Sequence, residues 1–136
     1  YRKINKNIPN QAKKEGVNSY QKNLQKALKN MNNSKELLQK VVQIMLENYP
    51  EKIKGIRKAI KNNDSENLEL KAHSLKGSLQ DLYFKKAADL SRQLEKMGRN
   101  KDLSQTETIF NKLTSEMKTI ENFLKEFNWK DFNKQD

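Results

Sequence analysis

The chain of 136 residues has no cysteine, a single histidine, two prolines and four glycines. Without cysteine there can be no disulfide and no thiolate metal site, and one histidine leaves only carboxylates to complete any other metal site. No apolar run approaches the length of a membrane span, and no signal-like segment opens the chain. The scarcity of proline and glycine is typical of a protein that is helical over most of its length.

What the chain does contain supports the same interpretation. Hydrophobic residues make up 34% and charged residues 33% of the sequence, which is a balance found in water-soluble helical proteins. The length suffices for one domain with a single core and is too short for two well-buried domains. Because the first residue is Tyr1 and not methionine, we expect the chain to be a piece of a longer protein.

The net charge of +11 is concentrated near the N-terminus. Residues 1–30 contain eight Lys or Arg and one acidic residue, Glu15, which gives +7, whereas the rest of the chain contributes only +4. Residues 1–18 have no sustained periodicity and are interrupted by Pro9 and Gly16, so we interpret them as a basic linker. A basic tail can attract acidic proteins or nucleic acid, and the charge alone does not decide between them.

Apolar residues recur at helical spacing through the remainder of the chain. A short helix is expected around Tyr20 to Met31, and a second that Ser34 caps and that ends near Pro50. Further helices are expected over about 53–60, from Asp64 or Ser65 past His73, over about 84–97 with Gly98 as the stop, and from Ser104, in a capping box with Glu107, to Phe127.

No stretch alternates in the manner of a β-strand, so the expected fold class is all-α. Four long helices joined by short connections can bury their apolar stripes only against one another. We therefore predict an antiparallel four-helix bundle with a short additional N-terminal helix that covers one end. The predicted organisation is a linker over residues 1–18, the bundle over 19–128 and a C-terminal tail over 129–136.

The single histidine lies in the helix that begins near residue 65. At about 100° per residue, Leu68, Ala72, Leu75, Leu79 and Leu82 form one stripe, whereas His73 falls about 140° away from Leu68. This placement argues against a buried core histidine. A solvated histidine without a role is the other plain interpretation, and the nearby Gly77 argues against it.

Gly77 lies one turn after His73 on the same side of the helix. A glycine in a helix interior costs about 0.5 to 1 kcal/mol relative to alanine, so a helix that contains one usually needs the missing side chain. The missing side chain at Gly77 leaves the imidazole of His73 accessible to another protein. Lys76 can bring its ammonium beside an anion on the ring. A convex helix face offers no water-excluding pocket for general acid or base catalysis, so a phosphoryl group carried by His73 is the chemistry that fits best.

The stretch "AHSLKGS", residues 72–78, resembles the signature of histidine phosphotransfer (HPt) domains, a His-x-x-Lys-Gly motif in the middle of a bundle helix. The similarity extends to residues 35–78, with two helices around a proline before the histidine helix, and to "AADLSRQLEKMG", residues 87–98. It covers about residues 20–127. One departure is Tyr83, where the family often has glycine, so the turn after the histidine helix is expected to differ.

The resemblance implies a phosphorelay intermediate in a two-component system, without kinase activity of its own. His73 would be phosphorylated, Lys76 would stabilise the phosphate and Gly77 would permit docking. Glu69 and Gln80 are candidates to orient the ring, and the apolar Leu70 is a candidate docking contact. We expect no cofactor and no metal in this domain, with Mg²⁺ supplied by the partner.

The same resemblance predicts the context of the domain. Response-regulator receiver domains are the expected partners, within or beside a parent hybrid sensor histidine kinase, and the isolated domain is expected to be a monomer. We expect a cytoplasmic location, free or tethered to the inner face of a membrane through the parent kinase, with no nucleic acid and no direct membrane contact.

Two alternatives remain at this stage. A dimerisation and phosphoacceptor domain of a sensor kinase is also helical and phosphorylated on histidine, but it typically has an acidic residue where Ser74 follows His73 here. A basic helical nucleic-acid-binding module would also fit the charge, and its binding should then depend strongly on salt.

Overall fold

The structure is a computed structural model that describes residues 19–132, and this part of the chain contains helices and turns but no β-strand. A short helical segment, residues 19–30, is followed by α2 (Lys35–Lys61), α3 (Ser65–Asp81), α4 (Lys85–Asn100) and α5 (Thr106–Glu126). The predicted linker, residues 1–18, and residues 133–136 of the predicted tail lie outside the described residues.

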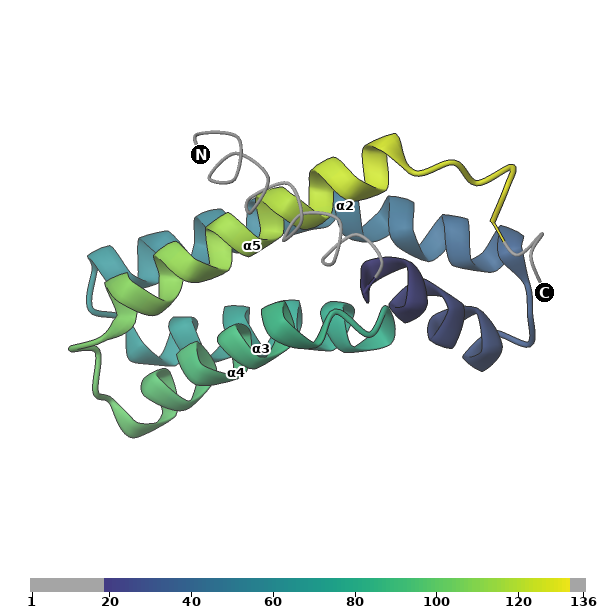
Figure 1. Cartoon of the computed structure of the whole chain (residues 1–136). Helices are drawn as coiled ribbons and strands as arrows, with labels where there is room; N and C mark the ends of the chain where they lie inside the picture. The colour runs from purple at the N-terminus through teal and green to yellow at the C-terminus, as the bar shows by residue number, and fades with distance from the viewer. Residues whose placement is uncertain (1–18, 133–136) are drawn as a thin grey trace, which may run out of the picture.

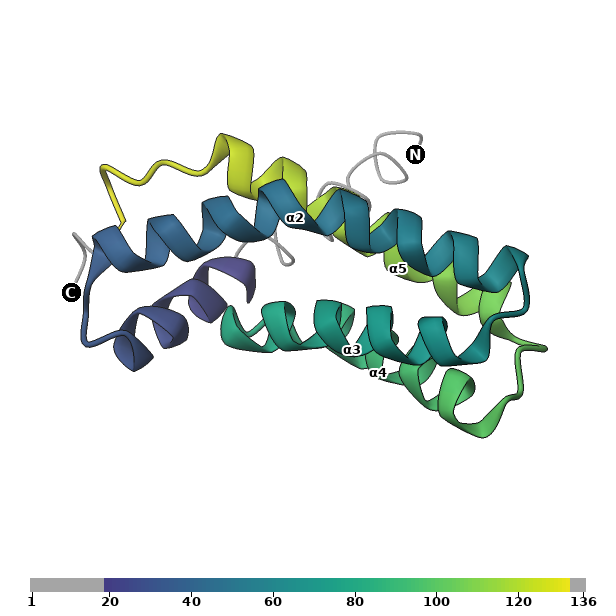
Figure 2. The same cartoon turned by 180° about the vertical axis from the view of Figure 1, so that it is seen from behind.

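The four long helices form an antiparallel bundle in which α2 and α5 lie side by side and α3 and α4 pack against one half of them (Figure 1). At 1.5 Å per residue, α2 is roughly 40 Å long and α3 only about 25 Å long. The short helix, residues 19–30, lies beneath the part of α2 and α5 that extends beyond α3 and α4 (Figure 2). The predicted fold, an antiparallel four-helix bundle with an additional N-terminal helix, is confirmed.

Two helices begin where the sequence predicts a cap. The Ser34 side chain accepts a hydrogen bond from the backbone N–H of Leu37 at 3.1 Å, and Asp64 accepts one from the backbone N–H of Asn67 at 3.1 Å. Each cap satisfies a helix N–H that has no partner within the helix. These interactions fix the starts of α2 and of α3, the helix that contains His73.

The predicted helix boundary at Pro50 is wrong, because α2 runs through this residue without a break. Proline removes one backbone hydrogen bond, but the buried residues before and after it lie on one face. Those residues are Leu38, Val42, Met45, Ile56 and Ala59. Burial of both halves of α2, the first over the short helix and the second over α3 (Figure 2), outweighs the loss of a single hydrogen bond.

The predicted helix stop at Gly98 is also wrong. Helix α4 continues to Asn100, and Lys101 adopts the left-handed conformation that closes it, with a φ of 57°. Gly98 is buried inside the helix, where an added Cβ would lie 2.6 Å from the carbonyl oxygen of Ser65 and 2.7 Å from the backbone nitrogen of Glu69. The glycine therefore serves the close approach of α3 and α4.

The expected capping box between Ser104 and Glu107 is not formed. Helix α5 starts at Thr106 after Gln105, which makes no side-chain cap. The hydroxyl and the backbone N–H of Ser104 both donate to the carboxylate of Asp102, at 2.8 and 3.3 Å. Ser104 is thus used to shape the connection after α4 and not to begin α5.

The turn between α3 and α4 contains Tyr83 in the left-handed conformation, with a φ of 62°. Glycine adopts this region at no steric cost, so the glycine that the family often has could form the same turn, and the expected difference in the turn does not follow from Tyr83. Its hydroxyl accepts a hydrogen bond from the side-chain amide of Asn30, at the end of the short helix. That contact links the turn to the short N-terminal helix.

Aromatic residues hold the short helix and the C-terminal segment on the bundle. The Tyr20 ring packs against Phe84 and Phe123, and its hydroxyl donates to the Glu116 carboxylate at 2.6 Å. In the segment predicted as a tail, Phe132 is buried in the core, and Trp129 is partly buried beside it. Residues 129–132 therefore pack as part of the bundle.

Candidate functional site

Helix α3 has one buried and one exposed face, and His73 lies on the exposed one. Its buried residues are those of the predicted stripe, namely Leu68, Ala72, Leu75 and Leu79, followed by Leu82 at the C-cap. The His73 side chain is 67% exposed. The prediction that the imidazole lies off the core is confirmed, and the rigid helix beneath it fixes where the ring projects.

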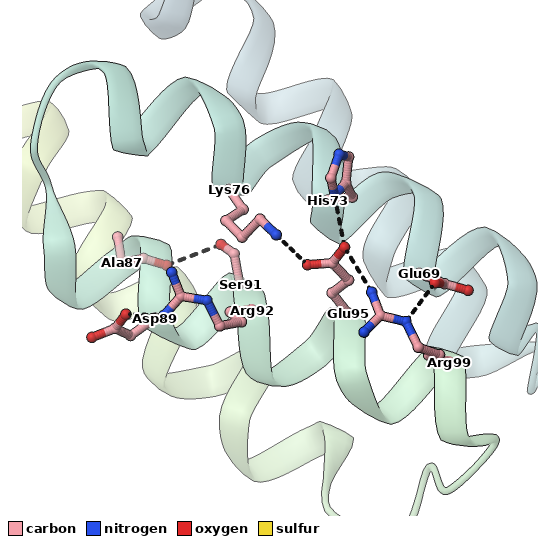
Figure 3. Close-up of polar contacts among 9 residues, drawn as sticks. All are labelled: Glu69, His73, Lys76, Ala87, Asp89, Ser91, Arg92, Glu95 and Arg99. Atoms are coloured by element: carbon pink, nitrogen blue, oxygen red, sulfur yellow. Dashed lines mark hydrogen bonds and ion pairs between the residues drawn. The ribbon is translucent and has the colours of Figure 1, made fainter.

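The His73 ring is anchored by a carboxylate from α4. Its Nδ1 lies 2.6 Å from Oε2 of Glu95, whose side chain is only 5% exposed (Figure 3). Burial alone would raise the pKa of Glu95, but the hydrogen bonds from Lys76 and His73, together with the charge of Lys76, outweigh it and hold the pKa below its ordinary value. Glu95 is therefore ionised at neutral pH.

Two cations complete the environment of Glu95. The Lys76 Nζ lies 2.7 Å from Oε1, and the Arg99 Nη2 lies 3.2 Å from Oε2 (Figure 3). No buried side-chain nitrogen or oxygen within residues 19–132 lacks a hydrogen-bond partner. A buried carboxylate that is paired in this way keeps its charge without an unsatisfied oxygen.

The Glu95 carboxylate determines which nitrogen of His73 is free. An ionised carboxylate can only accept hydrogen bonds, so the hydrogen of neutral His73 is on Nδ1 and is donated to Glu95. The lone pair of Nε2 then points away from Glu95, on the exposed side of α3. The arrangement provides a nucleophilic nitrogen at the surface, with a buried negative charge behind the ring.

The two glycines beside the site have opposite surroundings. An added Cβ at Gly77 would meet no atom within 4 Å, so the position is open, as the sequence predicts. Gly98 instead lets the backbones of α3 and α4 approach closely, which brings Glu95 within hydrogen-bonding distance of His73. Gly77 leaves open space at the surface of α3, and Gly98 sets the distance between α3 and α4.

Of the remaining candidates, two lie beside His73 and one does not. Glu69 and the 61% exposed Leu70 line a shallow depression together with His73, and the Glu69 carboxylate pairs with Arg99 and not with the ring. Gln80 is exposed two turns further along α3, about 10 Å from His73 along the helix axis, and within the described part of the chain it makes no hydrogen bond to the ring.

Glu95 and Arg99 were not among the residues predicted for the site. A signal was present in α4, where Ala87, Ser91, Glu95 and Gly98 are buried at intervals of four, four and three residues, next to the leucine stripe. Small residues at helical spacing indicate a face that approaches another helix closely. The partner of Glu95 depends on the register between α3 and α4, which a single sequence does not contain.

Residues 19–132 offer neither a metal site nor a membrane-spanning helix. In the described range, no three His, Cys, Asp or Glu side chains are grouped so that they could hold a metal ion. None of the helices in residues 19–132 combines the length and the apolar character that crossing a membrane requires.

Comparisons with known proteins identify the family and the fold. The family model "Hpt domain" matches residues 40–123, more than half of the chain, and this range includes His73, Lys76, Gly77, Glu95 and Arg99. No curated protein sequence matches the chain. The crystal structure of histidine-containing phosphotransfer protein B (HptB) from Pseudomonas aeruginosa PAO1 is similar, with a TM-score of 0.67 and 18% identity over 77% of this chain and 90% of that one.

At this identity the structural similarity supports the fold alone, and the family model supports the function. Hpt domains exchange phosphoryl groups with response-regulator receiver domains. The alternatives of a sensor-kinase dimerisation domain and a nucleic-acid-binding module are not favoured. The chain belongs to the Hpt domain family, and its role is histidine phosphotransfer in a phosphorelay.

Proposed function

We propose that His73 is the residue of this Hpt domain that carries the phosphoryl group, and that Nε2 is the phosphorylated atom. The observation that carries the proposal is the 2.6 Å hydrogen bond between Nδ1 and Glu95, on a ring whose side chain is 67% exposed. It directs the free lone pair outward, where a partner can reach it. His73 is also the only histidine in the chain.

The phosphoryl transfer step requires no external acid or base. The Nε2 lone pair forms a bond to the phosphorus of an aspartyl phosphate, and the bond from phosphorus to the aspartate oxygen breaks with its electron pair on the departing carboxylate. The ring keeps its Nδ1 hydrogen and becomes positively charged. Glu95 stabilises that charge, and the reverse step delivers the phosphoryl group to an aspartate of a second receiver.

Lys76 and Gly77 have supporting roles in this proposal. The Lys76 ammonium balances the charge of Glu95 at 2.7 Å before transfer, and it provides positive potential for the phosphoryl group afterwards. Gly77 leaves open space in front of the helix, which admits the receiver's phospho-aspartate. Glu95 acts as a positioning residue through the ring.

We further propose that the Mg²⁺ needed for transfer is bound by the receiver and that this domain binds no cofactor. The finer context, a hybrid sensor histidine kinase with cytoplasmic receivers, is supported by the linker-like composition of residues 1–18. A monomeric state of the isolated domain is supported by its surface. Across residues 19–132 the exposed large hydrophobic residues are only Leu37, Ile44 and Leu70.

The test is phosphorylation of the full chain by a receiver domain that has been phosphorylated with acetyl phosphate and Mg²⁺. We expect acid-labile phosphorylation of the wild-type chain at His73, located by mass spectrometry, and none in His73→Gln. The variant should unfold at the wild-type temperature, because His73 is exposed and contributes little to packing. Phosphorylation of His73→Gln to the wild-type extent would refute the assignment.

A further inference from the structure

Glu95 is held by two cations that differ in how firmly they are bound. Lys76 is only 17% exposed and approaches Oε1 of Glu95 to 2.7 Å. Arg99 is 59% exposed and has the longer contacts, 3.2 Å to Oε2 of Glu95 and 3.0 Å from its Nε to Oε2 of Glu69. Exposed ion pairs contribute little to stability, so Arg99 is the cation that can change partners at the lower cost.

The four ion-paired groups beside the unphosphorylated ring have balanced charges, and Glu66 adds one more carboxylate to the lining of the depression. Lys76 and Arg99 supply two positive charges, and Glu95 and Glu69 supply two negative ones. A phosphoryl group adds a charge of about −1.5 to −2, as phosphorylated side chains do near neutral pH. The phosphorylated ring itself carries one positive charge, and Lys76 is already paired with Glu95 at 2.7 Å, so a second cation is needed to offset the remaining negative charge.

Among the described residues that line the shallow depression beside His73, Arg99 is the only one with a permanent positive charge. Its lining residues are Glu66, Glu69, Leu70, His73, Glu95 and Arg99. The three carboxylates there would repel a phosphoryl group, and the long arginine side chain lies next to the ring through its contact with the same Glu95 oxygen that His73 contacts. A guanidinium is also the cation best suited to bind phosphate oxygens in pairs.

We infer that Arg99 is a second cation for the phosphoryl group on His73, held by Glu69 at the rim of the site until that group arrives. The inference rests on the proposed phosphorylation of His73. Glu69 competes with the phosphoryl group for the guanidinium, so it limits how strongly phosphohistidine is stabilised. The Arg99–Glu69 pair thereby sets how the phosphoryl group is distributed between this domain and its receivers.

The direct test is the Nε–Hε resonance of Arg99 in ¹⁵N-labelled full-length chain, recorded before and after phosphorylation by a receiver. It should shift when His73 is phosphorylated, because the guanidinium leaves Glu69. Arg92 is a matched control, since it lies on the same helix, is similarly exposed and pairs with Asp89 at 2.7 Å. Its resonance should stay in place.

The functional test is the equilibrium of the phosphoryl group between the domain and one receiver. Arg99→Ala should shift it toward the receiver by about fivefold, and Glu69→Gln should shift it toward His73 by about threefold. Arg92→Ala and Asp89→Asn should each leave it unchanged. A folding defect cannot mimic this result, because it would not move the two variants in opposite directions.

Failure of this inference can be distinguished from failure of the proposed function. Wild-type chain phosphorylated at His73 with an unmoved Arg99 resonance, and with Arg99→Ala at the wild-type equilibrium, would overturn the role of Arg99 alone. Chain that is phosphorylated equally well after His73→Gln would overturn both.

Discussion

Gly77 on α3 and Gly98 on α4 are both interior helix glycines beside the site, yet a methyl group would meet opposite surroundings at the two positions. At Gly77 it would meet nothing within 4 Å, whereas at Gly98 it would lie 2.6 Å from a backbone oxygen of α3. Both glycines are poor helix formers that lie next to His73. Gly77 serves the approach of a partner, whereas Gly98 serves the packing of α4 against α3. Two interior helix glycines can therefore be present for different physical reasons.

The comparison also separates two requirements of the site. Phosphotransfer needs an accessible Nε2, which an open surface provides. It also needs a ring held in one orientation, which depends on the distance between α3 and α4. Gly77 affects only the first requirement and Gly98 affects the second, so substitutions at the two glycines should have different consequences.

The largest effect is expected for Gly98→Ala. The methyl group would collide with the backbone of Ser65 and Glu69, which cannot swing away as a side chain can. We expect a loss of about 2–3 kcal/mol in the free energy of unfolding, seen by urea titration, and a thermal midpoint about 5–10 °C lower. Slower phosphotransfer should accompany it, because Glu95 would move away from His73.

Gly55→Ala is the matched control for this substitution. At Gly55 on α2, an added Cβ would lie 3.2 Å from the flexible side chain of Lys71, which can move aside. The free energy of unfolding should then change by less than about 1 kcal/mol. Equal destabilisation by the Gly98 and Gly55 substitutions would contradict the distinct role of Gly98.

The two glycines also show which features of the fold the sequence could predict and which it could not. Helical periodicity predicted the bundle and the exposure of His73, and residue type predicted caps at Ser34 and at Asp64 or Ser65, because these depend on residues close together in the chain. A glycine after an apolar stripe usually ends a helix, and at Gly98 that rule failed. Whether such a glycine ends a helix or admits a neighbour depends on a contact with another helix.

The same reason explains what was missed at the site. His73, Lys76 and Gly77 lie within five residues, so one helix and one motif suffice to predict them. Glu95 and Arg99 are 19 or more residues away on α4, and the contact of Glu95 with His73 and of Arg99 with Glu69 depends on the register of two helices. Pro50 is a further case, since α2 continues through it because the residues on both sides of the proline are buried against other helices.

A smaller but more specific effect is expected for Gly77→Gln. The side chain would project into the open space before Nε2 and obstruct the in-line approach of the phospho-aspartate. We expect phosphotransfer to slow at least about tenfold, which corresponds to about 1.4 kcal/mol in the barrier. The rate is measured from the decay of the phosphorylated receiver after rapid mixing.

The stability of the same variant is part of the test. Glutamine has a better helix propensity than glycine, so the thermal midpoint should stay the same or rise. Transfer at the wild-type rate would show that the open space at Gly77 does not serve docking. An unfolded variant would show that Gly77 packs against a neighbour, contrary to the surroundings described for it.

The smallest effect is expected for Gly77→Ala, which changes the helix and barely changes the surface. Alanine should raise the free energy of unfolding by up to about 1 kcal/mol, because it restricts the unfolded chain and meets no atom within 4 Å in the fold. A single methyl group is too small to block the approach, so transfer should slow by less than about threefold and remain faster than in Gly77→Gln. Stability and transfer rate should thus change in opposite directions, with the rate falling as the side chain lengthens. If alanine slowed transfer as much as glutamine does, backbone flexibility and not open space would be what the reaction requires at this position.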